Sequence, residues 1–162
     1  MFERPGSGER AILVCVGLGH APEPDRVEEF TALARSAGAQ VLEIMTVTRK
    51  VAEPRFFLGT GKVEEVRQRI AELGADLVVV DHALSPGQER NLEKELACRV
   101  LDRSGLILDI FAQRARTFEG KLQVELAQLK YALPRLDLRD DALSRLTGGI
   151  GGRGPGETKL EI

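Results

Sequence analysis

Residues 11–18 read AILVCVGL, an uncharged run of apolar and small side chains that is rich in β-branched residues. Such a run is typical of a strand that is buried on both faces of a parallel sheet. Residues 77–80, LVVV, repeat the pattern, and residues 40–47 and 99–101 are predicted to form two further strands. Four strands of this kind, separated by helical segments, indicate βαβ units of an α/β domain.

Helix signals lie between these strands. Residues 27–37 and 63–73 each carry an apolar face and end at a glycine. Ser85 and Pro86 are predicted to open a third helix, as its N-cap and its first helical residue. Right-handed crossovers then favour a small doubly wound parallel sheet of strand order 2-1-3-4 with flanking helices, spanning residues 10–103.

The next part of the chain, residues 104–135, is predicted to be helical. A shorter helix over 106–115 leads into a long amphipathic helix that Pro134 ends. Apolar residues of the long helix recur every three or four positions and form a seam: Phe118, Leu122, Leu126, Leu129 and Leu133. Because such a seam is not expected to remain in water, we expect it to pack against a helix outside this chain, against the α/β module or against a second copy.

Composition narrows the class of protein. The chain has 162 residues, of which 43% are hydrophobic and 30% charged, with a net charge of −2. It shows neither a signal-peptide pattern nor an apolar run of the roughly 20 residues that a membrane span needs. Cys15 and Cys98 lie in apolar runs, which argues against a disulfide scaffold and favours the reducing cytoplasm.

Charge differs between the two parts of the chain. Residues 1–98 contain 12 Lys and Arg against 16 Asp and Glu, whereas residues 99–162 contain 11 against 9. The C-terminal part is therefore better suited to a polyanion such as RNA, although its excess of positive charge is small. Residues 1–9, with their Pro, Gly and Ser, are predicted to be a flexible N-terminus.

Nucleotide hydrolysis by this chain alone is not expected. A P-loop needs the pattern GxxxxGK(S/T), but Gly61 and Lys62 are followed by Val63, and Phe56 stands where the first glycine is needed. Residues 149–154 match GxGxxG but follow no strand of the predicted sheet, so we interpret the match as accidental. Without a nucleophile-elbow pattern or metal-ligand spacing, we predict neither catalytic residues nor a bound metal.

Polar and glycine residues at the predicted carboxyl ends of the strands form the first candidate site, since ligands of open α/β sheets bind there. They are Gly17, Gly19, His20, Asp81, His82 and Asp102. Asp81 and His82 are adjacent, so an extended chain directs them to opposite faces and makes them a poor acid–base pair. The alternative is that these side chains simply face water.

The second candidate site lies in residues 136–162, which are predicted to be a glycine-rich loop followed by the start of a helix. Six of the nine residues 148–156 are glycine. Glycine permits close approach of the backbone to a phosphate-rich surface, and Arg153 would pair with a phosphate or stack on a base. From the residues alone, such a binding loop and a flexible linker are equally good interpretations.

Four ordered blocks of the sequence resemble the N-terminal region of the HflX family of ribosome-associated GTPases. They are FFLGTGKVEEV (56–66), LSPGQERNLE (84–93), DRSGLILDIFAQRARTFEGKLQVELAQLKYALPRL (102–136) and GGIGGRGPGETKLE (148–161). The family pattern continues with a second long helix and a G domain, which we expect to lie beyond Ile162. The resemblance implies that the missing helix covers the apolar seam.

The resemblance also implies a function. In this family the region docks on the large ribosomal subunit, contacts rRNA and helps to split stalled ribosomes, while GTP and Mg²⁺ bind in the G domain. By matching motif, it implies ribosome-facing residues in the loop: Gly148, Gly149, Gly151, Gly152, Arg153, Gly154, Pro155 and Gly156. Weaker candidates, on the preceding helices, are Gln113, Arg114, Arg116 and Lys121. The alternative is a Rossmann-like module that binds a small molecule or nucleotide at the strand ends.

Overall fold

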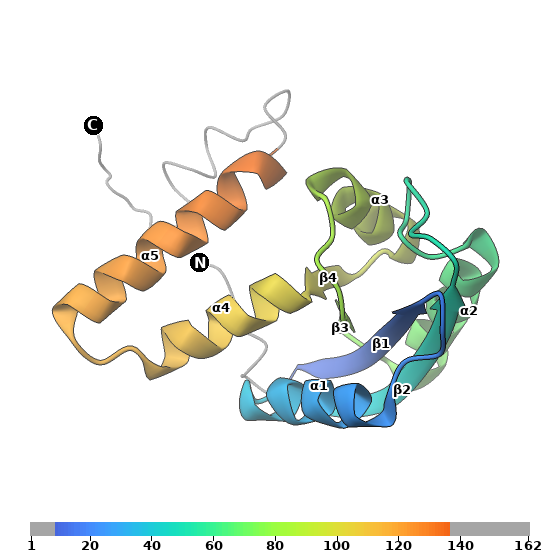
Figure 1. Cartoon of the computed structure of the whole chain (residues 1–162), viewed down its shortest axis with the longest axis horizontal. Coiled ribbons are helices and arrows are strands. Elements are labelled where there is room, and N and C mark those ends of the chain that lie inside the picture. Colours follow the sequence, from blue (N-terminus) through green and yellow to red (C-terminus); the bar gives the residue numbers. More distant parts are fainter. Residues whose placement is uncertain (1–8, 137–162) are drawn as a thin grey trace.

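The computed structural model describes residues 9–136, and its sheet has the predicted strand order. All neighbouring strands are parallel, in the order β2-β1-β3-β4 (Figure 1). The strands are β1 (Arg10–Leu18), β2 (Gln40–Arg49), β3 (Leu77–Val80) and β4 (Arg99–Asp102). The glycine-rich loop predicted for residues 148–156 lies outside the described residues.

Alternate side chains of β1 enter two separate cores. Ile12, Val14 and Val16 pack on one face of the sheet, under α2 (Thr60–Leu73) and α3 (Pro86–Leu96). Ala11, Leu13 and Cys15 pack on the other face, under α1 (Pro24–Ser36) and α4 (Arg103–Arg114). A strand with a core on each face needs no polar side, which is why the continuous apolar run predicted a buried strand.

Side-chain caps define where three of the helices begin. Ser85 and Gln88 form the capping box that opens α3, with Pro86 in the first turn as predicted. Helix α4 begins at Arg103, earlier than the predicted residue 106, because the Asp102 carboxylate accepts a hydrogen bond of 2.8 Å from the Gly105 N–H. Helix α5 (Phe118–Ala132) is capped by Thr117 and ends in a short 3₁₀ turn, η1 (Leu133–Arg135).

Helices α4 and α5 form a hairpin, called the arm here, that extends from the sheet beside β4 (Figure 1). Helix α4 leads away from the sheet and α5 returns, so that the end of α5 lies near α3 and β4. The apolar seam of α5 does not pack against the α/β module: Leu122 and Leu129 are 48% and 40% exposed. Of the partners predicted for the seam, the module is therefore excluded in this structure.

Candidate functional site: the arm and its anchor

The end of α5 is fastened to the rim of the sheet by a buried carboxylate. Asp102, the last residue of β4, is fully buried and accepts hydrogen bonds from the backbone N–H groups of Leu84 and Gly105, at 2.9 and 2.8 Å. The hydroxyl of Tyr131, on α5, donates a third hydrogen bond of 2.5 Å. Arg135 completes the set with an ion pair of 3.5 Å. We call Asp102, Tyr131, Arg135 and Glu89 the anchor.

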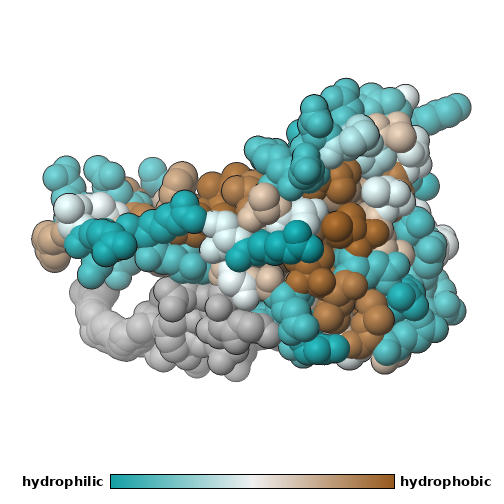
Figure 2. All heavy atoms as spheres, turned by 90° about the horizontal axis from the view of Figure 1, so that it is seen from below, coloured by the Kyte–Doolittle hydropathy of each residue, from teal (hydrophilic) through white to brown (hydrophobic). Residues whose placement is uncertain are grey.

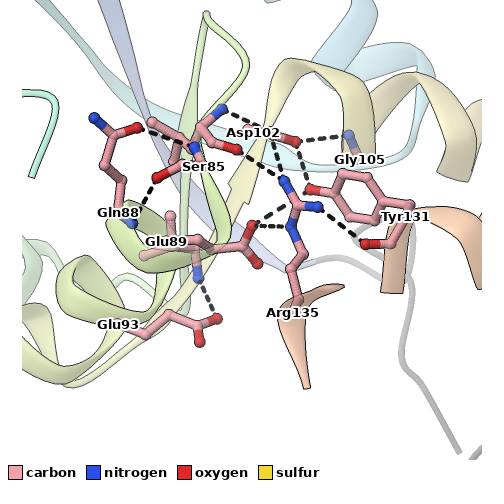
Figure 3. A network of polar contacts seen from close by, with 10 residues as sticks. Ser85, Gln88, Glu89, Glu93, Asp102, Gly105, Tyr131 and Arg135 are labelled. Atoms are coloured by element: carbon pink, nitrogen blue, oxygen red, sulfur yellow. Dashed lines mark hydrogen bonds and ion pairs between the residues drawn. The ribbon is translucent and has the colours of Figure 1, made fainter. Parts of the chain in front are cut away.

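Arg135 joins the remaining parts of the anchor (Figure 3). Its Nε donates to the Glu89 carboxylate on α3 at 2.7 Å, and its Nη2 donates to the Leu84 carbonyl at 2.9 Å. The guanidinium also lies 3.8 Å from the centre of the Tyr131 ring, within the range of a cation–π contact. One side chain thereby connects α3, the loop after β3, β4 and the arm.

Burial controls the protonation of the anchor. It raises the pKa of the Tyr131 hydroxyl, and the hydrogen bond to Asp102 raises it further. Burial also raises the pKa of the Glu89 carboxyl, against the opposing effect of Arg135. Burial lowers the pKa of Arg135, but the hydrogen bond to Glu89 and nearby negative charge outweigh it, so the net shift is upward. A neutral tyrosine and a charged arginine therefore serve as donors around Asp102.

The arm carries most of the large exposed apolar side chains in the described part of the chain. Phe118 is 80% exposed, Leu126 54% and Leu133 50%, and Phe111 on α4 adds to this surface. In Figure 2 apolar surface is visible on the arm as well as over the sheet module. A groove of about 380 Å³ also runs between the two helices, lined by residues that include Leu108, Phe111, Val124 and Ala127. An uncovered apolar stripe of this extent is typical of a surface that binds a macromolecule.

Two of the predicted strand-end residues take part in contacts within the fold. The Asp81 carboxylate is paired with Arg26 and Arg103, both at 2.9 Å, and is 1% exposed. His82 points to the other face of the sheet, where Nε2 lies 2.8 Å from the Val16 carbonyl oxygen. The expectation that these neighbours point apart is therefore confirmed.

The other strand-end residues do not converge with Asp81. His20 is exposed, and its Nδ1 lies 2.7 Å from the Ala21 carbonyl oxygen. Gly17 accommodates the loop that folds back over it, because a Cβ there would lie 2.0 Å from the His20 carbonyl oxygen. Gly19 has a positive φ of 83°. The two glycines thus shape the turn after β1, and Asp102 belongs to the anchor.

The weaker ribosome-facing candidates lie on the arm. Gln113 donates hydrogen bonds to the Ala37 carbonyl at 3.0 Å and to Asp109 at 2.8 Å, so it joins α4 to the end of α1. Arg114 is exposed and donates to the Ser36 hydroxyl at 2.5 Å. Arg116 and Lys121 are exposed near the turn between the two helices. Residues 148–156 lie outside the described residues, so their role stays a prediction.

Sequence reasoning missed the anchor because its members are far apart in the chain. Tyr131 and Arg135 are 29 and 33 residues from Asp102. The sequence carries one local signal for it: an aspartate at the end of a predicted strand and at the start of a helical segment is typical of an N-cap. Asp102 is this N-cap, and it accepts from the N–H of Gly105, three residues later. Within residues 9–136, no helix is long and apolar enough to cross a membrane, and no group of three potential metal ligands is found.

Family models match most of the chain. The model described as GTP-binding GTPase N-terminal matches residues 24–112, and the one described as GTP-binding GTPase Middle Region matches residues 114–162. The boundary between them falls at the end of α4.

Curated relatives and solved structures agree with this match. The GTPase HflX of Escherichia coli K12 is 52% identical over 99% of this chain, and that of Caldanaerobacter subterraneus is 50% identical over all of it. The chain spans 38% of the length of both relatives. A crystal structure of SsGBP with GDP superimposes with a TM-score of 0.68 at 27% identity, covering 85% of this chain and 39% of that one. The chain therefore belongs to the HflX family of GTPases and corresponds to its N-terminal region.

Proposed function

We propose that this chain is a ribosome-docking region of an HflX-type GTPase. In this proposal it binds the large ribosomal subunit in the cytoplasm, contacts rRNA, and takes part in splitting stalled ribosomes. GTP and Mg²⁺ bind in a G domain outside this chain, and the chain supplies no catalytic residue of its own. The observation that carries the proposal is the arm, because it is fastened to the sheet at one end, extends away from the sheet, and exposes Arg116 and Lys121 near its turn.

The geometry of the arm suits a docking element. The anchor holds the end of α5 through charge-assisted contacts of the buried Asp102 with half-buried side chains, so the arm has a defined direction before it meets a partner. A pre-organised element loses less conformational freedom on binding, which favours affinity. The seam then offers an apolar surface for a helix of the same protein, while Arg116 and Lys121 near the turn supply positive charge for RNA.

Within this proposal the glycine-rich loop makes the RNA contact. Residues 148–156 combine six glycines with Arg153, a composition that suits close backbone approach to phosphate. Gly152→Val and Gly154→Val would introduce side chains that block this approach. Arg153→Ala would remove a charge-assisted hydrogen bond, at a cost of about 1–3 kcal/mol of binding free energy.

A filter-binding titration of the chain against purified 50S subunits, repeated at several salt concentrations, tests the proposal. We expect weak binding by the wild type, and weaker binding by each of the three loop variants without loss of fold. The effect of Arg153→Ala should shrink as salt rises, because phosphate contacts release counterions. Arg35→Ala, which removes an exposed charge on α1, is the matched control and should bind like wild type. Equal binding by all variants at every salt concentration would leave the loop as a linker.

The contacts at the strand ends do not favour the alternative of a small-molecule site there. Asp81 already pairs with two arginines, and Asp102 is surrounded by four donors. A ligand at this rim would have to displace these contacts. The geometry therefore supports the docking role better than the strand-end site.

A further inference from the structure

A polar cleft lies at the end of the edge strand β2, at the opposite edge of the sheet from β4, where the arm is attached. It has a volume of about 630 Å³ and runs between the last residues of β2 and the first turn of α2; we call it the α2 cleft. Its lining is formed by Thr46, Val47, Thr48, Arg49, Glu53, Gly59, Thr60, Gly61 and Lys62. None of these residues belongs to the anchor or to the arm.

The first turn of α2 has neither a side-chain cap nor an acidic residue. Gly59 is the N-cap residue and provides no side-chain hydrogen bond. Lys62 stands there instead, although the N-terminus of a helix favours negative charge. By contrast, α3, α4 and α5 are each capped at their first turn by a side-chain oxygen, and α1, which has no such cap, carries Asp25 in its first turn. The first N–H groups of α2 therefore lack the side-chain acceptor that those three helices have.

Arg49 adds a second cation to the same cleft, directly over the helix end. A Cβ on Gly59 would lie 2.5 Å from its Nη1, so the guanidinium occupies the space that the glycine leaves. The Nε of Arg49 is buried and has no hydrogen-bond partner among residues 9–136. Because the Nε is buried in protein, the guanidinium would meet an oxyanion in the cleft through its terminal N–H groups, which form strong charge-assisted hydrogen bonds with oxyanions.

The nearby carboxylates do not compensate these charges fully. Glu53 lines the cleft, but its Oε1 accepts hydrogen bonds from the backbone N–H groups of Arg55 and Phe56, at 2.9 and 2.7 Å. Lys62 pairs at 2.9 Å with Glu65, whose side chain is 55% exposed. Exposed ion pairs of this kind contribute little free energy and exchange partners easily. The lysine is therefore free to turn toward an anion in the cleft.

We propose that the α2 cleft binds a phosphate group, held by Arg49, Lys62 and the first backbone N–H groups of α2. The Arg49 guanidinium and the Lys62 ammonium would supply positive charge, and the first N–H groups of α2 would supply oriented hydrogen-bond donors. Val63 stands where a P-loop has its Mg²⁺-binding hydroxyl, so the cleft recognises phosphate without the layout of a P-loop. The proposal does not depend on ribosome docking.

A titration of the full chain with inorganic phosphate, followed by ¹H–¹⁵N NMR at constant ionic strength, tests the proposal. We expect saturable shifts of the backbone amides of Thr60, Gly61 and Lys62, and none when chloride replaces phosphate. Arg49→Gln should weaken the apparent affinity about tenfold, which is the loss of one charge-assisted hydrogen bond. Lys62→Gln should weaken it about threefold to fivefold, because ammonium is a less directional donor.

Two further variants keep the test decisive. Lys50→Gln removes an exposed charge beside Arg49 that does not line the cleft, and it should bind phosphate like wild type. Gly59→Ala keeps both cations but would displace the guanidinium, and it should weaken binding as Arg49→Gln does. The absence of saturable shifts at these amides, or equal affinity in wild type and in Arg49→Gln, would overturn the proposal.

Short RNA distinguishes the source of the phosphate. If hexauridylate shifts the same amides at lower concentration than inorganic phosphate and the effect requires Arg49, the ligand is a phosphodiester of an RNA backbone. If only inorganic phosphate acts, the site takes a free phosphate or a small phosphorylated compound. Both results support the cleft as a phosphate site. RNA binding that is independent of Arg49, with no response to inorganic phosphate, would overturn it.

Discussion

The carboxylate of Asp102 has no exposure to solvent and accepts from four donors. They are the backbone N–H groups of Leu84 and Gly105, the Tyr131 hydroxyl and the Arg135 guanidinium. A buried charge is tolerated only when it is paired and hydrogen-bonded, and here the donors come from four different elements. The residue therefore works in two ways: it caps α4, and it fixes the last turn of the arm.

The first prediction concerns the charge on this residue. Asp102→Asn keeps the shape of the side chain but replaces one acceptor oxygen by an NH₂ donor that faces existing donors. It also leaves Arg135 without one of its carboxylates. We expect the free energy of unfolding to fall by about 2–4 kcal/mol, measured by urea denaturation. Glu28→Gln, at an exposed position inside α1, is the control and should change it by less than about 0.5 kcal/mol. A comparable loss in both variants would contradict the anchor.

Asp102 also shows what sequence reasoning can and cannot find. Its place at the carboxyl end of β4 was predictable, because the apolar run before it marks a strand. Its role as a candidate ligand contact stays a prediction. The contacts that the structure does show, with Tyr131 and Arg135, arise through tertiary packing and leave no local pattern in the sequence. Only the local contact to Gly105 leaves a recognisable pattern in the sequence.

At the scale of the elements, the start of α4 and the end of α5 pack closely together at Gly105. A Cβ at this position would lie 2.6 Å from a Leu101 methyl and 2.8 Å from the Tyr131 hydroxyl oxygen. The absence of a side chain thus lets Tyr131 reach Asp102. The glycine serves close packing between elements, although glycine inside a helix lowers helix stability.

The second prediction follows from this close approach. Replacing an internal helical glycine by alanine ordinarily stabilises a protein by about 0.5–1 kcal/mol. For Gly105→Ala we expect the opposite, a loss of about 1–3 kcal/mol, because the added methyl group would displace Tyr131 or Leu101. Gly87→Ala in α3 is the matched variant, since its Cβ would come no nearer than 4.0 Å to the Ser85 hydroxyl. The melting temperatures of both variants, compared with that of the wild type, test this expectation. A higher melting temperature for Gly105→Ala would refute the packing argument.

The elements themselves were largely predictable for simple physical reasons. Strands buried on both faces are continuous apolar runs, and short crossovers leave few strand orders, so β2-β1-β3-β4 could be expected. The start of α4 was placed three residues late because Arg103 to Gly105 carry no apolar periodicity. The direction of the arm depends on the anchor, and a single sequence does not reveal such distant contacts.

For the molecule as a whole, stability and proton binding are linked through two thiols, of which Cys15 is buried and Cys98 is half-buried. Burial, with nearby negative charge, raises the pKa of Cys15 from 9.0 to about 11, and the same causes raise the pKa of Cys98 to about 11. Between these values the unfolded chain has lost protons that the folded chain keeps. The stabilisation is therefore complete below about pH 9 and is lost as the pH rises through 11.

The third prediction is a decline of stability at alkaline pH that depends on these cysteines. We expect the free energy of unfolding of the wild type to fall between pH 9 and pH 11, with a contribution from the thiols on the order of 1–3 kcal/mol. The double variant Cys15→Ala, Cys98→Ala should show a smaller decline over the same range. Urea denaturation under reducing conditions measures both, and because each protein is compared with itself, the cavity left at Cys15 cancels. Parallel declines would show that the thiols are not involved.

The anchor has a mechanical consequence for the polypeptide that continues after Leu136. A pulling force on that continuation would act first on Arg135 and Tyr131, which are held from α3, the loop after β3 and β4 at once. Because these contacts come from several elements at once, they would have to break together, whereas a frayed helix end opens one residue at a time. A force applied to this continuation would therefore reach α3 and the rim of the sheet at Asp102, and would not be absorbed by the end of α5 alone.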